Sequence, residues 1–509
     1  MDILITMLIF ASGMMLSMMG EYIFSGAVLI ALALYLYIWH YIKSGGRILD
    51  PAGLFSLSWI GGAGVSALKL SWLQTDWEPE TWMAIWLMAA GFFLAYGFFD
   101  KAHGSFFRKR REGRKDKASQ ADIIIDSKGS RDYIGRGSKG SQGDVRGDRE
   151  DPCAVIGRGR DIKREAFFTA IAIFITMAVS LSAFIFEAVM LGYIPLFTVD
   201  TPHAYSYFHV TGVHYFTTAF VLVPSEAFVY MHISGASLRK LKPMDMGVLI
   251  CTILSLVLPL LLVSRFQLIF ALMLCGITAL LIRGDDLRSL LRGKRKFYLL
   301  AMLISVILLY VFLTIERAHS VEYLRSIFEI RNEKLPIWII QPYMYVANNF
   351  DNINCLIRDL GQHSGGLRML YPLIVFSGLK FIRPELCAFP IYVTKEELTT
   401  LTIAYDAYYD FGLTGVLLFG MVLGAFMALI SRKFIAPGGT GGEEKEKEKG
   451  TKKRTFGLLY VLAAQPLFYV MLSFFTTWYS NPSTWFYLGV TVLTYAFVYI
   501  CMRITDGKQ

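Results

Sequence analysis

The sequence predicts an all-α polytopic membrane protein with about 12 transmembrane helices. Of its 509 residues, 55% are hydrophobic, 15% are aromatic and only 18% are charged, unlike an ordinary water-soluble globule. About 20 apolar residues cross a bilayer as a helix, because every backbone N–H and C=O is then bonded within the segment. Such windows lie near residues 3–19, 22–42, 53–70, 81–99, 167–190, 208–231, 246–263, 266–282, 297–315, 409–430, 455–475 and 485–502.

The Lys and Arg residues of the connecting loops predict the orientation, since these residues are enriched in cytoplasmic loops. Loops rich in them follow the second, fourth, sixth, eighth and tenth spans and alternate with loops that hold few. An even number of spans then places both termini in the cytoplasm and makes this a multi-pass protein of the cytoplasmic membrane. The formal net charge of +10 reflects that topology, and without a nucleic-acid-binding motif we predict no nucleic-acid partner.

Polar segments divide the chain. Residues 101–165 are rich in Arg, Gly, Ser and Asp and hold few aromatic residues, so they cannot bury enough apolar surface to offset their ordering entropy. We therefore expect a disordered basic cytoplasmic loop there, and a second charged linker at 432–454. The expected units are spans 1–4 in residues 1–100, the loop 101–165, spans 5–9 in 166–315, an extracytoplasmic segment in 316–408, and spans 10–12 in 409–509.

The extracytoplasmic segment is long and polar, which favours an enzyme over a transporter. Within it, residues 348–360 predict an amphipathic helix with Asp351 and Arg358 on its polar face. The apolar run 367–382 is too short to cross the membrane alone, so we expect an interfacial or re-entrant helix. In the alternative, residues 335–348 cross as well, although two prolines disfavour that.

Arg265 is the sharpest candidate for a functional group. Apolar residues flank it on both sides, and the seventh and eighth spans must turn tightly there, at the outer surface by topology. A guanidinium stays protonated and offers a planar fork suited to a diphosphate at headgroup level. The alternative is an arginine that snorkels to the interface and only anchors the helix.

Other candidate groups lie in the extracytoplasmic segment. A glycine-rich loop presents His363, and Arg368 follows it. A histidine suits proton transfer near neutral pH, and a carboxylate such as Asp351 can serve as a base or orient a histidine. The spacing of three other histidines, at 203, 209 and 214, does not place them on one helical face. We therefore predict neither a metal site nor a cofactor.

Residues 401–415, Leu-Thr-Ile-Ala-Tyr-Asp-Ala-Tyr-Tyr-Asp-Phe-Gly-Leu-Thr-Gly, resemble the signature of the oligosaccharide repeat unit polymerases, the O-antigen polymerase or Wzy-like family. Where that family often has Asn shortly before Thr, residues 395–402 here have none. With further points of similarity, the resemblance covers most of the chain outside 101–165. These points are the Gly-x-Ile-Pro-Leu stretch at 192–196, Ser264-Arg265, the helix at 349–354 and the segment 71–82.

The resemblance implies a metal-independent, GT-C-like helical bundle that acts as a glycosyltransferase. It would move a glycan from a polyprenyl diphosphate carrier to an incoming lipid-linked repeat unit at the outer leaflet, with inversion or retention. Arg265, with Arg358 or Arg368, would stabilise the charge on the diphosphate leaving group. His363 or Asp351 would take the proton of the acceptor hydroxyl. The expected partners are the lipid bilayer, the polyprenyl-diphosphate-linked oligosaccharide and a chain-length regulator.

Further roles are expected at the tenth span. Tyr405 and Tyr409 would stack on sugar faces. Asp410 either caps the N-terminus of the span or takes part in catalysis. Gly420 and Gly424, four residues apart, favour close helix packing.

Two other functions stay open. A ligase that moves the finished glycan to another acceptor would share the arginine chemistry and nearly the same architecture. A flippase or transporter of lipid-linked oligosaccharide would account for the spans and for buried polar groups such as Glu187 and Glu226. It would favour paired inverted repeats, which we do not find in the sequence.

Overall fold

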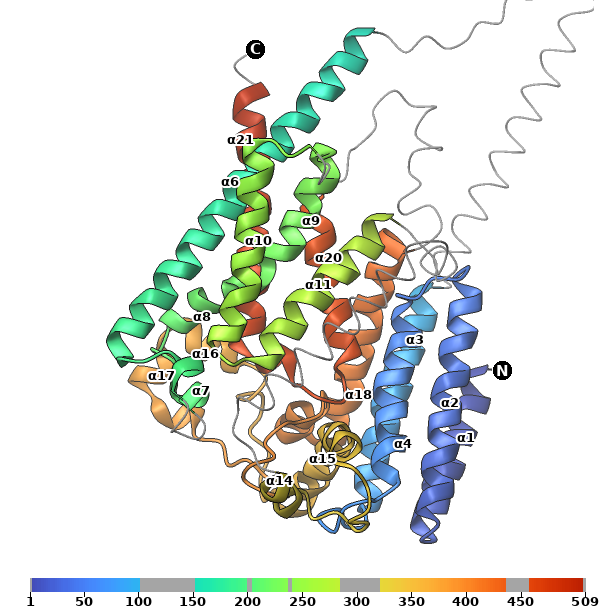
Figure 1. Ribbon diagram of the computed structural model, residues 1–509. Helices are drawn as coiled ribbons and strands as arrows, with labels where there is room; N and C mark the ends of the chain where they lie inside the picture. Colours follow the sequence, from blue (N-terminus) through green and yellow to red (C-terminus); the bar gives the residue numbers. More distant parts are fainter. Residues whose placement is uncertain are drawn as a thin grey trace, which may run out of the picture.

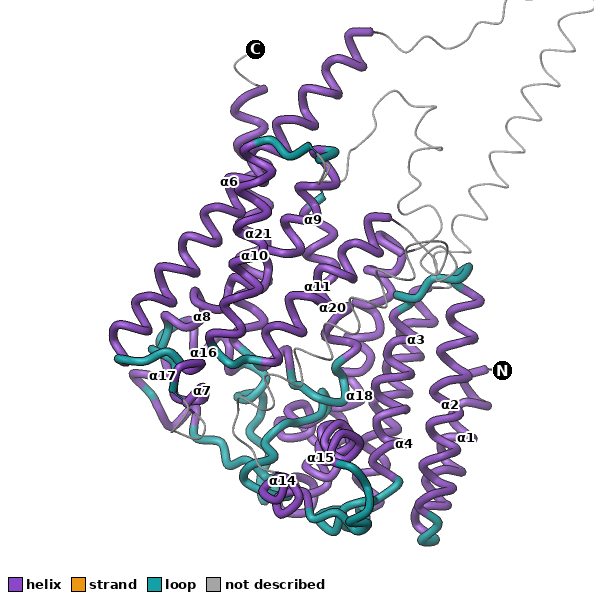
Figure 2. The backbone as a smooth tube through the Cα atoms, viewed as in Figure 1, coloured by secondary structure: helices purple, strands orange, loops and turns teal. Residues whose placement is uncertain are grey.

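The computed structural model describes residues 2–100, 152–198, 204–236, 240–283, 321–435 and 457–506. This part of the chain consists of helices joined by loops, and it contains no strand beyond an isolated bridge between Ser71 and Ile330 (Figure 2). Eight of its helices are long and apolar enough to cross a membrane, which makes the protein a helical multi-pass membrane protein. They are α2 (Tyr22–Lys43), the helix Pro79–Asp100, α6 (Pro152–Leu191), the run Val213–Ser234 formed by α8, η3 and α9, α10 (Pro243–Leu261), α11 (Arg265–Arg283), α18 with its π-helical end η5 (Tyr405–Ile435), and α21 (Pro482–Asp506).

Three other predicted spans are helical but shorter or interrupted. They are α1 (Asp2–Met18), α20 (Leu458–Met471), and the pair α3 (Pro51–Phe55) and α4 (Gly61–Ala67), joined by the π-helical turn η1 (Ser56–Ile60). The span predicted at 297–315 lies outside the described residues. The C-terminal end of α11 and the helix α14 (Val321–Phe328), which lie on its two sides in the sequence, are at opposite ends of the bundle (Figure 1). The total of twelve spans stays a prediction.

The loops rich in basic residues and the long polar segment lie at opposite ends of the bundle. The C-terminal end of α2 and the N-terminal end of α10, which are next to basic loops, lie at one end, which we call the basic-loop end (Figure 1). Residues 321–404 gather at the other end, which we call the outer-segment end. This separation matches the alternation of basic and weakly basic loops in the sequence.

Long-range packing extends the amphipathic helix of the outer segment. We predicted it over residues 348–360, but α15 runs from Ile337 to Asp359 and includes Pro342. The added turns pack with α14 (Val321–Phe328) in an apolar cluster of the outer-segment end. The predicted polar face is also wrong, because Asp351 is buried while Arg358 is exposed. The sequence pattern did not predict this burial, because it depends on contacts between α15 and distant parts of the chain.

Two other predicted elements have different bounds. The apolar run 367–382 forms two short helices, α16 (Tyr371–Phe376) and α17 (Leu379–Ile382), and not one. Gly378 between them has φ 75°, a left-handed conformation that ends a helix. The predicted disordered loop is wrong for residues 152–165, which form the first turns of α6. Residues 101–151 and 436–456 lie outside the described part.

Glycines let α18 cross the helix Pro79–Asp100 at very short distance, as predicted. A Cβ added to Gly424 would lie 2.2 Å from the carbonyl oxygen of Phe92, and one added to Gly420 would lie 2.7 Å from that of Met88. Such distances are far below van der Waals contact. Close approach of the two backbones therefore requires glycine at both positions.

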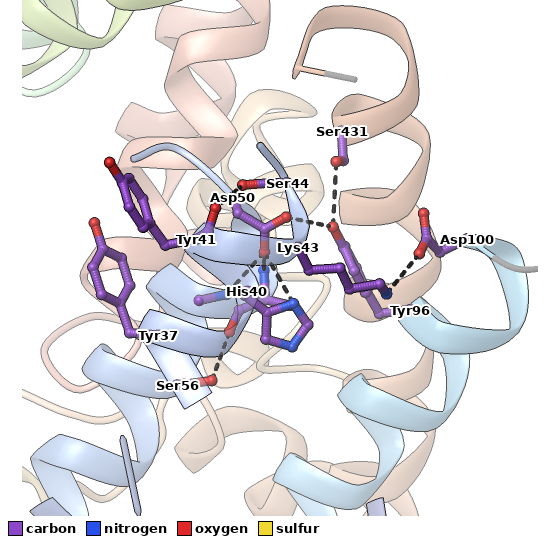
Figure 3. A network of polar contacts seen from close by, with 12 residues as sticks. Tyr37, His40, Tyr41, Lys43, Ser44, Asp50, Ser56, Tyr96, Asp100 and Ser431 are labelled. Carbon is purple, nitrogen blue, oxygen red and sulfur yellow. Dashed lines mark hydrogen bonds and ion pairs between the residues drawn. The ribbon is translucent and has the colours of Figure 1, made fainter. Parts of the chain in front are cut away.

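A polar network ties four helices together at the basic-loop end (Figure 3). The Asp50 carboxylate accepts two backbone N–H groups in the first turn of α3, both at 3.1 Å, and so caps that helix. The Tyr96 hydroxyl lies between Asp50 Oδ2 at 3.4 Å and Ser431 Oγ at 3.2 Å. His40 Nδ1 of α2 lies 3.4 Å from Asp50 Oδ1. Asp50 thus joins α2 and α3 to the helix Pro79–Asp100 and to the end of α18.

We expect Gly424→Ala to destabilise the protein, because its methyl group meets a backbone carbonyl that cannot rotate away. Overpacking of this kind costs about 1–3 kcal/mol. The midpoint of thermal unfolding in detergent, followed by Trp fluorescence, measures the loss. Gly276→Ala in α11 is the matched control, since its Cβ would meet nothing within 4 Å and alanine favours helix. Equal midpoints for both variants would contradict the close-packing argument.

Candidate functional site

A cavity of about 650 Å³ lies at the outer-segment end, a size typical of small-molecule sites. Its walls come from α11, α14, α15, α20 with the residues that follow it, and the loop 397–400. Of the described residues that line it, Arg265 alone is cationic and Glu397 alone is anionic. The rest are mostly apolar, with a few neutral polar groups. They are Phe266, Ile269, Tyr323, Leu324, Ile327, Phe328, Gln341, Pro342, Met344, Tyr345, Val346, Asn348, Leu398, Thr399, Thr400, Phe468, Leu472, Phe474 and Phe475.

Arg265 reaches the cavity because α10 and α11 are joined by a very tight turn, as the sequence predicts. Val263 in that turn has φ 51°, a strained conformation for a β-branched residue. Arg265 is the first residue of α11, so its guanidinium is close to the positive end of the helix dipole. The side chain is largely buried, and its Nη2 donates a hydrogen bond to Tyr345 Oη at 3.0 Å.

A polar stripe on α15 faces the cavity and the loop 394–400. Asn352 Nδ2 donates to the carbonyl oxygens of Leu398 and Thr400, both at 2.8 Å. Asn348 Nδ2 donates to the carbonyl oxygen of Leu398 at 3.2 Å, and the amide oxygen of Asn352 accepts the N–H of Thr394 at 2.9 Å. The loop is therefore held against the helix by side-chain amides. These asparagines come from α15, whereas the resemblance led us to look for one within the loop.

A chain of hydrogen bonds joins this loop to Arg265. The Thr400 hydroxyl donates to the amide oxygen of Asn349, whose Nδ2 donates to the carbonyl oxygen of Tyr345 at 2.6 Å. The Tyr345 hydroxyl in turn accepts from Arg265. α15 thus positions both the guanidinium and the loop that carries Glu397.

Asp351 lies on the opposite side of α15 and does not line the cavity. Trp77 Nε1 donates to Oδ1 at 2.7 Å, and Gln74 Nε2 donates to Oδ2 at 2.8 Å. Burial raises the pKa of the Asp351 carboxyl to about 7, although these donors oppose the shift. Both oxygens are occupied by protein donors, which fits a link between α15 and the segment 71–77. A role as catalytic base stays a prediction that this geometry does not favour.

The three predicted diphosphate-binding arginines do not come together. Arg358 is exposed and paired with its neighbour Asp359, with Nε 2.8 Å from Oδ1. Arg368 forms a largely buried ion pair with Asp406, and the ring of Tyr409 lies 4.8 Å from its guanidinium. Arg265 is the one of the three that lines the cavity.

Arg368 belongs to a second cluster, at the start of α18. The Asp410 carboxylate accepts the N–H groups of Arg368 at 3.1 Å and Met369 at 2.8 Å, and the hydroxyl of Ser364. Asp410 therefore caps the turn at 366–370. α18 (Tyr405–Ile430) is broken at Gly412, two residues after Asp410, so a cap of the tenth span by Asp410 stays a prediction.

The remaining predicted site residues belong to this second cluster. His363 Nδ1 lies 3.3 Å from the carbonyl oxygen of Tyr409. The Tyr405 hydroxyl donates to the carbonyl oxygen of Tyr392 at 3.0 Å and is buried. The structure thus joins His363, Arg368 and Asp410 with the two tyrosines, but none of the five lines the cavity. Their catalytic and sugar-binding roles stay predictions.

Sequence reasoning missed the polar stripe of α15 and Glu397. The stripe has a signal, since residues 341, 345, 348, 349 and 352 recur at helical spacing. Glu397 has none, because nothing in the local sequence separates it from Glu396. Only the turn of the loop brings one of the two glutamates to the cavity.

The fold and the cavity define a helical multi-pass membrane protein with a charged and largely apolar cavity at its outer-segment end. No protein-family model, no curated protein and no solved structure matches the chain.

Asp351 gives a pH-dependent stability with a definite sign. Its pKa in the folded protein, about 7, is above the ordinary value of 3.8, so the folded state holds more protons between those values. The stability contributed by the protonated form is therefore present below 3.8 and is lost as the pH rises to about 7. We expect the unfolding midpoint of Asp351→Asn to decrease less with rising pH than that of wild type. The exposed control Asp359→Asn should show the same decrease as wild type. An unchanged slope in Asp351→Asn would contradict the assignment.

Proposed function

We propose that this protein is a membrane glycosyltransferase that polymerises polyprenyl-diphosphate-linked oligosaccharide repeat units at the outer face of the cytoplasmic membrane. The observation that carries the proposal is the cavity, whose apolar walls hold the buried guanidinium of Arg265. The similarity of residues 401–415 to the O-antigen polymerases supports the same function. A cavity for one end of a lipid diphosphate needs this combination of apolar surface and fixed positive charge.

The chemistry required is modest, because a diphosphate is a good leaving group. An acceptor hydroxyl oxygen attacks the anomeric carbon of the donor glycan, and the bond from that carbon to the diphosphate oxygen breaks. The diphosphate leaves with the electron pair, and the acceptor gives up its hydroxyl proton. Arg265, fixed by Tyr345, stabilises the negative charge that grows on the leaving oxygen.

The first test is the glycan ladder of host cells that lack this chain and receive a variant at matched protein level. We expect wild type to restore long chains and Arg265→Ala to leave single repeat units, because a lost charge donor lowers the rate by about 10²–10³. Exposed Arg358→Ala is the control and restores the ladder. Unligated polymer in the absence of the chain would indicate a ligase. A normal ladder with Arg265→Ala would make this arginine only an interfacial anchor.

One observation favours a transporter as the second candidate. Glu226 in α9 is completely buried within a candidate span, and in the described part of the chain no Lys, Arg or His forms an ion pair with it. A carboxyl at membrane depth is costly and marks ion or proton pathways in transporters. A proton-coupled flippase of lipid-linked oligosaccharide would use such a group.

Purified protein in detergent separates the two candidates, because no gradient exists there. A glycosyltransferase elongates lipid-linked repeat units in detergent, and we expect Glu226→Gln to elongate them as wild type does. A transporter shows no elongation in detergent. In sealed vesicles with a proton gradient it moves the lipid-linked glycan across the bilayer, and Glu226→Gln abolishes that movement.

A further inference from the structure

We propose that Glu397 is the general base that takes the proton of the acceptor hydroxyl, in a single displacement that inverts the anomeric configuration. This inference rests on the proposed function. Arg265 stabilises the leaving diphosphate, and Glu397 would be the group that accepts the proton of the acceptor hydroxyl. Glu397 and Arg265 line the same cavity from different elements, the loop 394–400 and α11.

The loop holds Glu397 in place from both sides. The N–H of Leu398 donates to the carbonyl oxygen of Lys395 at 2.9 Å, which closes a tight turn around Glu397. On one side, the amides of α15 bind the carbonyl oxygens of residues 398 and 400. On the other side, Lys395 Nζ binds α14 and the residue after it, at 3.1 Å from the carbonyl oxygen of Ser326 and 3.0 Å from Glu329 Oε1. The backbone that carries Glu397 therefore loses little freedom when substrate binds.

The carboxylate of Glu397 is accessible to a substrate in the cavity. Lys395 is the nearest basic residue in the sequence, but its ammonium is paired with Glu329. Glu397 is exposed, and no described residue forms a hydrogen bond or an ion pair with its carboxylate. By contrast, protein donors already occupy the carboxylates of Asp351 and Asp410. A general base must reach the proton that it abstracts, and Glu397 meets that requirement.

A single displacement needs only one carboxylate. The acceptor oxygen forms its bond to the anomeric carbon, the bond to the diphosphate breaks, and Glu397 receives the proton as the diphosphate leaves with its electron pair. Double-displacement glycoside chemistry uses a carboxylate nucleophile and a second carboxyl group. Glu397 is the one carboxylate among the described lining residues, and a diphosphate needs no acid to leave. Inversion follows.

The experiment uses the full chain in detergent, with lipid-linked repeat units isolated from host cells that lack it. We expect Glu397→Gln to lower turnover by about 10²–10⁴ while KM for the lipid-linked donor changes little. We expect the acidic limb of the pH–rate profile to disappear in this variant and to persist in Glu397→Asp. Glu396→Gln is the matched control, since Glu396 is adjacent and exposed but does not line the cavity.

Each outcome separates the inference from the proposed function. Full turnover by Glu397→Gln together with loss by Arg265→Ala overturns the base and leaves the glycosyltransferase in place. A retained anomeric configuration overturns the single displacement. A glycosyl ester on Glu397, found by mass spectrometry, makes Glu397 a nucleophile and overturns the base. Absence of any elongation by wild type overturns the proposed function itself. The unfolding midpoint of Glu397→Gln, compared with that of wild type, excludes misfolding as the cause of lost turnover.

Discussion

The outer-segment end depends on one constraint, the need of the buried side-chain amides of α15 for hydrogen-bond partners. Asn348, Asn349 and Asn352 have almost no exposed surface, and an unpaired buried amide is costly. Each finds its partners in the loop 394–400 or in the backbone of α15 itself. As a result, a segment without regular secondary structure has a fixed path. The same bonds reach Tyr345 and through it Arg265, so a single helix positions two parts of the cavity wall, Arg265 and the loop 394–400.

The other face of α15 fastens the outer segment to the membrane helices. The amide oxygen of Asn354 accepts the N–H of Glu78 at 2.9 Å and the hydroxyl of Thr81 at 2.7 Å, at the start of the helix Pro79–Asp100. Asp351 holds Trp77 and Gln74 in the same way. Both faces of α15 therefore form hydrogen bonds as well as apolar contacts. This explains why the helix is buried although its sequence is not apolar enough for a membrane span.

Two arginines at this end illustrate different uses of the same group. Arg368 is enclosed by Asp406 and by aromatic rings, and removal of either partner of such a pair leaves a buried charge uncompensated. That cluster joins the turn at 366–370 to α18 and needs no ligand to be satisfied. Arg265 lies in a wall of apolar side chains beside empty volume, where an anion would find both a positive charge and a dry surface. The contrast supports Arg265, and not Arg368, as the group for a lipid diphosphate.

The sequence by itself determined that the chain is a helical multi-pass membrane protein, and it predicted the separation of basic loops from the polar segment, the glycine crossing of α18 and the tight turn before Arg265. These features follow from hydropathy, charge and residue size within short windows, which are local properties. The tertiary structure alone decided that α15 begins at Ile337 and that the helix predicted over residues 367–382 breaks at Gly378. It also decided that Asp351 is buried while Arg358 is exposed. It also decided that Glu397 lines the cavity and Glu396 does not. These outcomes depend on which faces meet across distant parts of the chain, and the free energy of such contacts is not encoded in any local pattern.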